Sequence, residues 1–252
     1  LHHSQIGTRN TALGYQSMLG VSSNSHYYNT AVGYKSLFAI TTGDSNVAIG
    51  YEAMSGSTTA ADNVAVGYQA AKSVTSTYGT TAVGYKAATS LVDGHSNTAF
   101  GYAALSNEVA SDESTAIGYQ ALRYQSGSTT TLGNTAVGHN AGQATTTADR
   151  NTYVGKSAAL NVTTGRQNTA LGWNAIPTVT TGTSNTAVGS MAGSQVSGSS
   201  SGNVFVGDQA GYALTQTLGN VLVGYQAGTN GGTAERNTML GHRAGSSLKG
   251  SN

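Results

Sequence analysis

The stretch Asn63-Val64-Ala65-Val66-Gly67-Tyr68 decides the fold, because close copies of it return fourteen times in the 252 residues. Ten of the thirteen intervals between the motif glycines are seventeen residues long. A period this strict indicates one structural unit stacked many times. The sequence therefore predicts a single repeat domain over residues 1–252, with coils over about residues 8–248 and no separate globular domain. The motif glycines are Gly14, Gly33, Gly50, Gly67, Gly84, Gly101, Gly118, Gly138, Gly155, Gly172, Gly189, Gly207, Gly224 and Gly241.

Repeat positions are numbered here from the motif glycine, which is position 0. Thr or Val at −3 and an aliphatic residue or Phe at −1 predict a short strand, and the −1 column is expected to be buried. Ala or Ser at +3, followed by a small or aliphatic residue, predicts a second short strand. Gly, Ser and Thr before the next copy are turn formers. Seventeen residues cannot bury a core alone, so the pattern predicts an all-β, parallel β-solenoid of about 14 coils.

Position −4 is the most regular polar position of the repeat. Asparagine stands there in twelve copies, which include Asn46, Asn63, Asn97, Asn134, Asn151 and Asn168. Asparagine tolerates left-handed turn geometry, and its amide can donate and accept hydrogen bonds along a stack. This column predicts a structural ladder of amides at a turn rather than a catalytic role.

Position +1 carries tyrosine in eight copies, which include Tyr34, Tyr51, Tyr68, Tyr85, Tyr102 and Tyr119. Stacked coils would align these rings along one edge. We interpret the column as aromatics that pack between coils or at the edge of another subunit, and a glycan-stacking or receptor strip is the alternative.

Position −2 is alanine in ten copies and a larger residue in four, Tyr153, Phe205, Leu222 and Met239. The last three of these larger residues come with glycine at +4, namely Gly211, Gly228 and Gly245. We hypothesise that volume is exchanged between two facing columns.

The composition argues against nucleic-acid binding, catalysis and metal binding. Only 8% of the residues are charged and the net charge is +1, with basic residues scattered, so nucleic acid is not an expected partner. There is no cysteine, and no apolar run reaches the roughly 20 residues of a membrane span. The carboxylates and six histidines are dispersed over the repeat, so we expect no enzyme, no cofactor and no metal site.

The copies Asn46-Val47-Ala48-Ile49-Gly50 and Asn63-Val64-Ala65-Val66-Gly67 resemble the repeats of trimeric autotransporter adhesin heads. The longer form, with Tyr-Gln after the glycine and a Thr-Thr-Gly turn, is similar to the repeats of phage tail fibres. This resemblance implies a left-handed parallel β-roll that assembles as a homotrimer. It also implies an extracellular structural or adhesive fibre segment, on a virion tail fibre or a bacterial cell surface, that presents or spaces a receptor-binding region for host attachment.

Specificity is expected where the period breaks, because an insertion in a solenoid must bulge from a turn. Two of the three breaks carry aromatics suited to stacking on sugars, so Tyr27, Tyr28 and Tyr124 are candidate contacts for a host cell-surface receptor or glycan. Neutral drift of the loops is the simpler explanation. The alternative function is a glycan-binding module along the tyrosine column or an ice-binding module along the threonines at −3.

Overall fold

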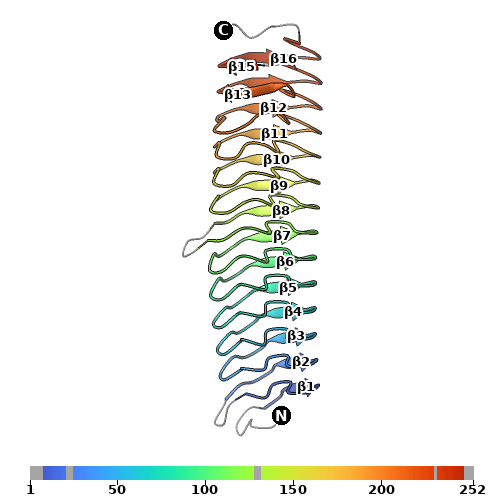
Figure 1. Ribbon diagram of the computed structural model, residues 1–252, viewed down its shortest axis with the longest axis vertical. Coiled ribbons are helices and arrows are strands. Elements are labelled where there is room, and N and C mark those ends of the chain that lie inside the picture. The colour runs from blue at the N-terminus through green and yellow to red at the C-terminus, as the bar shows by residue number, and fades with distance from the viewer. Residues whose placement is uncertain (1–7, 21–24, 128–131, 230–231, 247–252) are drawn as a thin grey trace. The chain divides into compact units, whose positions relative to one another are not determined.

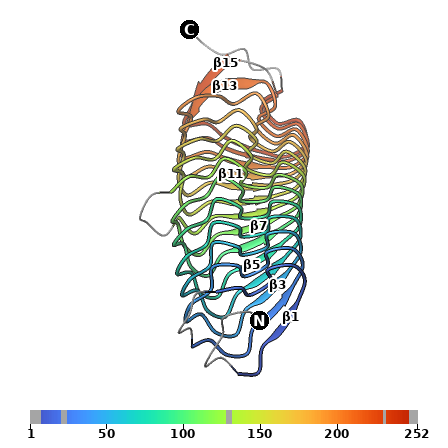
Figure 2. The same cartoon turned by 60° about the horizontal axis from the view of Figure 1, so that its bottom comes forward.

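The computed structural model describes residues 8–20, 25–127, 132–229 and 232–246. The chain forms two compact units, residues 1–132 and 133–252. All regular structure in the described residues is β, and no helix occurs among them. In both views the strands of each unit lie one above another (Figures 1 and 2). Each unit is a parallel β-solenoid, as the repeat predicts.

The first unit contributes one short strand per coil. Its strands are β1 (Thr11–Leu13), β2 (Thr30–Val32), β3 (Val47–Ile49), β4 (Val64–Val66), β5 (Thr81–Val83), β6 (Thr98–Phe100) and β7 (Thr115–Ile117). Neighbouring strands pair in parallel with equal repeat positions opposite each other, as in Ala48 opposite Ala65. The register therefore follows directly from the period.

The second unit continues the pattern and adds a small second sheet. Its motif strands are β8 (Thr135–Val137), β9 (Thr152–Val154), β10 (Thr169–Leu171), β11 (Thr186–Val188), β12 (Val204–Val206), β14 (Val221–Val223) and β16 (Thr238–Leu240). Two further strands, β13 (Leu214–Leu218) and β15 (Gly232–Glu235), pair in parallel with each other. Within the described residues the motif strands number seven in each unit, in agreement with the prediction of about fourteen coils.

The prediction that the −1 column is buried is wrong. Successive residues of a strand point to opposite faces, and here the −2 residue takes the inner face. Ala48 is fully buried, whereas Ile49 is 39% exposed and Phe100 is 54% exposed. The coil interior is narrow enough that alanine fills most of the −2 column, so the larger aliphatic side chains at −1 face outward.

The predicted second strand after the glycine is also wrong. Positions +2 and +4 both adopt the left-handed region, as in Glu52 (φ 52°) and Met54 (φ 50°), which is incompatible with an extended strand. Their amides still bond between coils: Glu52 N donates to Tyr34 O at 2.8 Å, and Met54 N donates to Ala70 O at 3.0 Å. This alternation keeps the inter-coil hydrogen bonds while the chain turns sharply.

Gly50 shows why position 0 must be glycine. Its φ is 135°, a conformation that other residues rarely adopt, and a Cβ there would overlap the carbonyl oxygen of Gly67 in the next coil. The close approach of successive backbones at this column thus fixes the residue type.

The interior of each coil is lined by positions −2, +3, +4 and +7. Aliphatic residues at +7 are buried where the structure describes them: Ile40, Val74, Leu91, Val162, Val179, Val196 and Leu214. Val21 and Leu248 of the same column lie outside the described residues. Most of the remaining core is alanine, so each coil buries little apolar area by itself.

The volume exchange between columns is confirmed in the second unit. The Phe205 ring occupies the space beside Gly211 and Gly193, where an added Cβ would lie 2.7 and 2.8 Å from ring carbons. Leu222 fills the space at Gly228 in the same way, at 2.6 Å. Phe205 and Leu222 at −2 therefore pack against glycines at +4.

Candidate functional site

The tyrosines at +1 form an unbroken ladder in the first unit. Successive ring centroids are 4.9–5.5 Å apart with interplanar angles of 7–13°, from Tyr15 through Tyr119. Each inner ring, such as Tyr68, is covered on both faces by its neighbours. The rings of the ladder, Tyr15, Tyr34, Tyr51, Tyr68, Tyr85, Tyr102 and Tyr119, remain 37–65% exposed through their edges and hydroxyl groups.

The exposed residues at −1 directly precede the motif glycine, whereas the tyrosines at +1 directly follow it. Leu13, Ile49, Phe100 and Ile117 are exposed, and Val32, Val66 and Val83 are half-buried. We call these side chains and the tyrosine ladder together the outer apolar surface of the first unit. Sequence reasoning missed the −1 half of this surface because it assigned those residues to the core.

The corresponding +1 column of the second unit has mixed chemistry. It contains His139, Lys156, Trp173, Ser190, Asp208, Tyr225 and His242 in chain order. Tyr225 and His242 of this column stack with their ring centroids 5.3 Å apart. We call Lys156, Trp173, Ser190 and Asp208 the mixed column, because these four consecutive coils carry a cation, a ring, a small hydroxyl and an anion.

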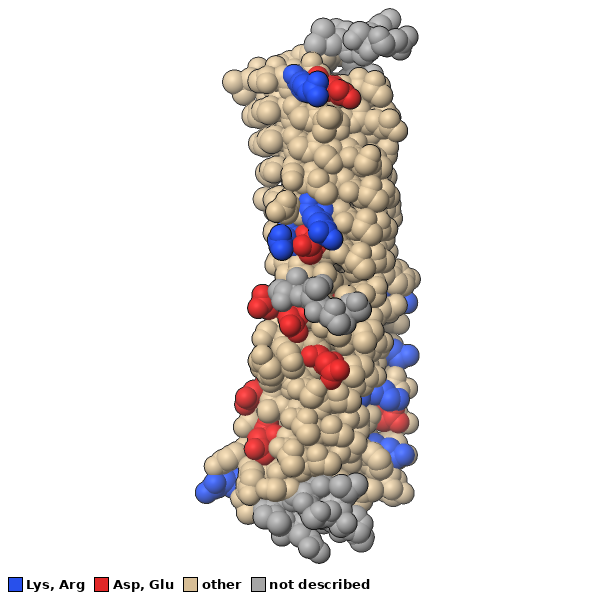
Figure 3. Space-filling model, turned by 90° about the vertical axis from the view of Figure 1, so that its left-hand side faces the viewer, with Lys and Arg blue, Asp and Glu red and all other residues tan. Residues whose placement is uncertain are grey.

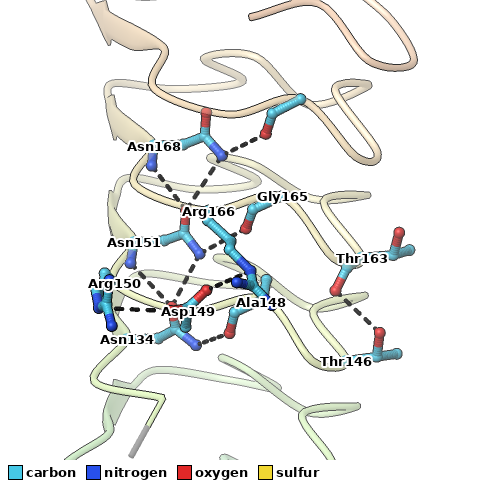
Figure 4. A network of polar contacts seen from close by, with 11 residues as sticks. Asn134, Thr146, Ala148, Asp149, Arg150, Asn151, Thr163, Gly165, Arg166 and Asn168 are labelled. Atoms are coloured by element: carbon cyan, nitrogen blue, oxygen red, sulfur yellow. Dashed lines mark hydrogen bonds and ion pairs between the residues drawn. The ribbon is translucent and has the colours of Figure 1, made fainter.

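Ten of the twelve asparagines at −4 are buried, and the column is bonded along the stack in both units. Asn151 N and Nδ2 both donate to Asn134 Oδ1 at 3.0 Å, and Asn151 Nδ2 also donates to Gly165 O at 3.0 Å (Figure 4). Asn168 repeats the pattern on Asn151. Asn46 and Asn63 do the same in the first unit, with both Asn63 donors 3.1 Å from Asn46 Oδ1. Through these hydrogen bonds the asparagine side chains hold the coils together.

Two coils of the first unit replace the ladder asparagine. Asn97 N donates to the Thr80 hydroxyl at a long 3.4 Å, and Ser114 N donates to Asn97 Oδ1 at 3.0 Å. Near Ser114 a carboxylate is fully buried: Glu108 Oε1 accepts the amides of Val109, Ala110 and Ser111 at 2.8–3.0 Å. Glu108 caps its own turn, so its burial has a structural explanation.

The loop aromatics proposed as receptor contacts lie in two separate places. Tyr28 is 56% exposed, and its hydroxyl accepts a hydrogen bond from Arg9 at 2.6 Å. Tyr27 is half-buried beside it, while Tyr124 is exposed with the Arg123 guanidinium 5.1 Å from its ring centroid. Among the described residues no contact joins Tyr124 to the other two. Parts of these insertions, residues 21–24 and 128–131, lie outside the described residues.

An aromatic pair outside the tyrosine column escaped the sequence analysis. Tyr78 stacks on His95 with ring centroids 4.0 Å apart, and Tyr78 N donates to His95 Nδ1 at 3.2 Å. The two residues are one period apart, so the period itself was the signal that would have paired them.

Charged side chains are sparse, and Figure 3 shows them as separate spots on a largely uncharged face. Hydrogen bonds from Lys72 and Gln69 lower the pKa of Glu52, and the Lys72 Nζ to Glu52 Oε2 distance is 2.7 Å.

Within the described ranges, no three His, Cys, Asp or Glu side chains gather as a metal site. In the same ranges no helix has the length and apolar character needed to cross a membrane.

Comparison with protein-family models, with curated proteins and with solved structures finds no match for this chain.

Proposed function

We propose that this chain is a structural, adhesive fibre segment that works as an assembly of identical chains, a homotrimer by resemblance to adhesin heads and tail fibres. The observation that carries the proposal is the outer apolar surface of the first unit, which a solitary chain would leave in water. Its role is mechanical: it spaces or presents a receptor-binding region outside a virion or cell. A left-handed winding is part of the same resemblance.

The size of the outer apolar surface supports association. An aromatic side chain offers roughly 150–250 Å², so seven rings about two fifths exposed leave on the order of 500 Å² uncovered. The −1 column adds to this area. A monomer's largest apolar patch is about 300–600 Å², and a stable interface buries about 800 Å² on each partner. The rings alone match a large monomer patch, and the −1 column extends the exposed apolar area toward that of an interface.

The period of the surface favours a second copy of this chain as its occupant. Its rings repeat every 4.9–5.5 Å over seven coils. Another copy repeats its side chains with the same axial step, whereas a globular partner has no such repeat. Side chains of two copies can therefore interdigitate over the whole length.

The ring geometry weakens the glycan-stacking alternative for the tyrosine column. Sugars stack on ring faces, but the inner rings have both faces covered by their neighbours. Ice binding keeps one supporting observation, because Thr81, Thr98 and Thr115 lie at −3 and share the outward side of their strands with −1. Val47 and Val64 interrupt that threonine file. Thermal hysteresis of the purified chain distinguishes ice binding from a fibre role.

The test of the proposed function is the mass of the chain in solution. Sedimentation equilibrium is expected to give three copies per particle, and Ile49→Lys with Val66→Lys is expected to reduce this to one, because a buried unpaired charge opposes association. Thr42→Lys with Thr59→Lys is the matched control, since both threonines are exposed elsewhere on the same coils. A native chain that stays monomeric at micromolar concentration contradicts the proposal.

A further inference from the structure

We infer that the mixed column of the second unit sets the axial register between copies, which the tyrosine ladder of the first unit is too uniform to do. This inference rests on the proposed self-association and adds the division of roles within it. The partner is a second copy of this chain.

The tyrosine ladder contributes contact area to the interface but does little to fix the axial alignment of the two copies. If a copy slides by one coil along seven tyrosines, each ring meets surroundings nearly equal to those it left. The cost of such a slip is the loss of contacts at one end only. Strands and coiled coils whose contact positions are all alike slip in the same way.

The mixed column changes chemistry at every coil. Trp173 is 50% exposed, Lys156 is exposed, and Ser190 and Asp208 are half-buried. No ion pair within the described part of the chain involves Lys156 or Asp208. Both charges, with the indole between them, are therefore available to a partner.

A slip by one coil is costly here for two reasons. It moves the bulky Trp173 to a place shaped for serine or lysine, leaving overlap on one side and a void on the other. It also moves Lys156 and Asp208 away from the groups that face them in the correct alignment, and misplaced charges are strongly disfavoured in an interface. Polar residues at single contact positions fix the register of coiled coils by the same mechanism.

The test replaces the mixed column by a uniform run of tyrosines like that of the first unit. Lys156→Tyr, Trp173→Tyr, Ser190→Tyr and Asp208→Tyr are combined in one variant, which is expected to fold because tyrosine already occupies this position in eight coils. Circular dichroism and the melting temperature verify folding. The control variant combines Tyr34→Phe, Tyr51→Phe, Tyr68→Phe and Tyr85→Phe, which changes as many residues as the test variant and keeps an aromatic ring at every coil of the ladder.

Register is measured by photo-crosslinking. The chain has no cysteine, so Asn174→Cys provides one attachment point for a benzophenone in each background. Labelled and isotopically distinct unlabelled chains are mixed, irradiated and digested, and mass spectrometry identifies the partner coil that was captured. The isotopes separate crosslinks between chains from those within one chain.

Native and control chains are expected to place crosslinks on one partner coil, about tenfold above the neighbouring coils, as for an alignment favoured by about 1.4 kcal/mol. In the uniform variant this preference is expected to fall to about twofold or less, with the particle mass unchanged. A uniform variant that still captures a single coil overturns the inference and leaves the proposed function standing. A native chain that remains monomeric overturns both.

Discussion

The first and second units share one backbone period and distribute their side-chain volume differently. In the first unit the −2 position holds alanine, as in Ala48, and in five of seven coils +4 holds a large residue such as Met54, both fully buried. In the second unit Phe205 fills −2 while Gly211 stands at +4. The outer +1 column differs as well, with a continuous tyrosine ladder in one unit and the mixed column in the other. The comparison teaches that a large side chain can fill the interior from either −2 or +4, and that neither column alone fixes the residue size.

The largest expected effect tests this exchange of volume directly. Phe205→Ala is expected to destabilise the second unit by about 3–5 kcal/mol, because it leaves a cavity beside two glycines. Gly211→Leu alone is expected to destabilise through overlap with the Phe205 ring. The double variant recreates the first unit's arrangement, in which Leu37 adopts φ 47° at +4, and is expected to recover much of the loss. Hydrogen exchange, which resolves local unfolding, measures all three. Additive destabilisation in the double variant would show that the columns are independent.

The asparagine ladder is common to both units, so its loss is expected to cost the same in each. Asn46→Ala removes the acceptor of Asn63 N, and Asn151→Ala removes that of Asn168 N; leaving such a buried donor unpaired costs about 1–3 kcal/mol. Asn46→Thr and Asn151→Thr are the milder controls, because Thr80 already serves at this position. Denaturant unfolding followed by hydrogen exchange gives the comparison, and a much smaller loss in one unit would break the equivalence.

Removing an aromatic ring at +1 is expected to lower stability by different amounts in the two units, and this difference is a smaller effect. Tyr68→Ser removes two stacked pairs and is expected to cost about 1–2 kcal/mol in the first unit. Trp173→Ser is expected to cost less, because no aromatic ring among the described residues stacks on Trp173. Melting of dilute, monomeric protein measures both variants. Equal losses would mean that the ladder adds no stability beyond that of a single exposed ring.

The smallest expected effect is a pH dependence confined to the first coils of the first unit. Burial lowers the pKa of His26 from 6.5, and nearby Asp44 opposes this shift. The folded state then binds the proton less tightly than the unfolded state, so stability is complete above about pH 6.5 and falls as the pH drops below it. Hydrogen exchange around β1 and β2 is expected to quicken between pH 7 and 5. His26→Gln is expected to remove the dependence, and an unchanged pH profile in that variant would assign the effect to another group.

Much of the fold follows from the sequence because repetition averages away local ambiguity. The seventeen-residue period predicts parallel stacking, equal register and the asparagine ladder, since equal positions must meet when coils stack. For the same reason, the sequence predicts that the large Phe205 at −2 is matched by Gly211 at +4. Local propensity gave less: Glu52 and Met54 suit regular structure, yet their left-handed conformations come from inter-coil hydrogen bonds that no propensity encodes.

The sequence by itself determined the period, the motif glycines, the amide ladder and the aromatic column of this protein. The tertiary structure decided which face of each strand is inside. Period-two alternation places Ala48 and Ile49 on opposite faces without saying which face is the core, and hydrophobicity suggested the wrong one. The narrow coil admits only a methyl group at most −2 positions, so the larger apolar side chains lie outside. Burial in this solenoid is set by the space inside the coil rather than by the apolar character of the residue.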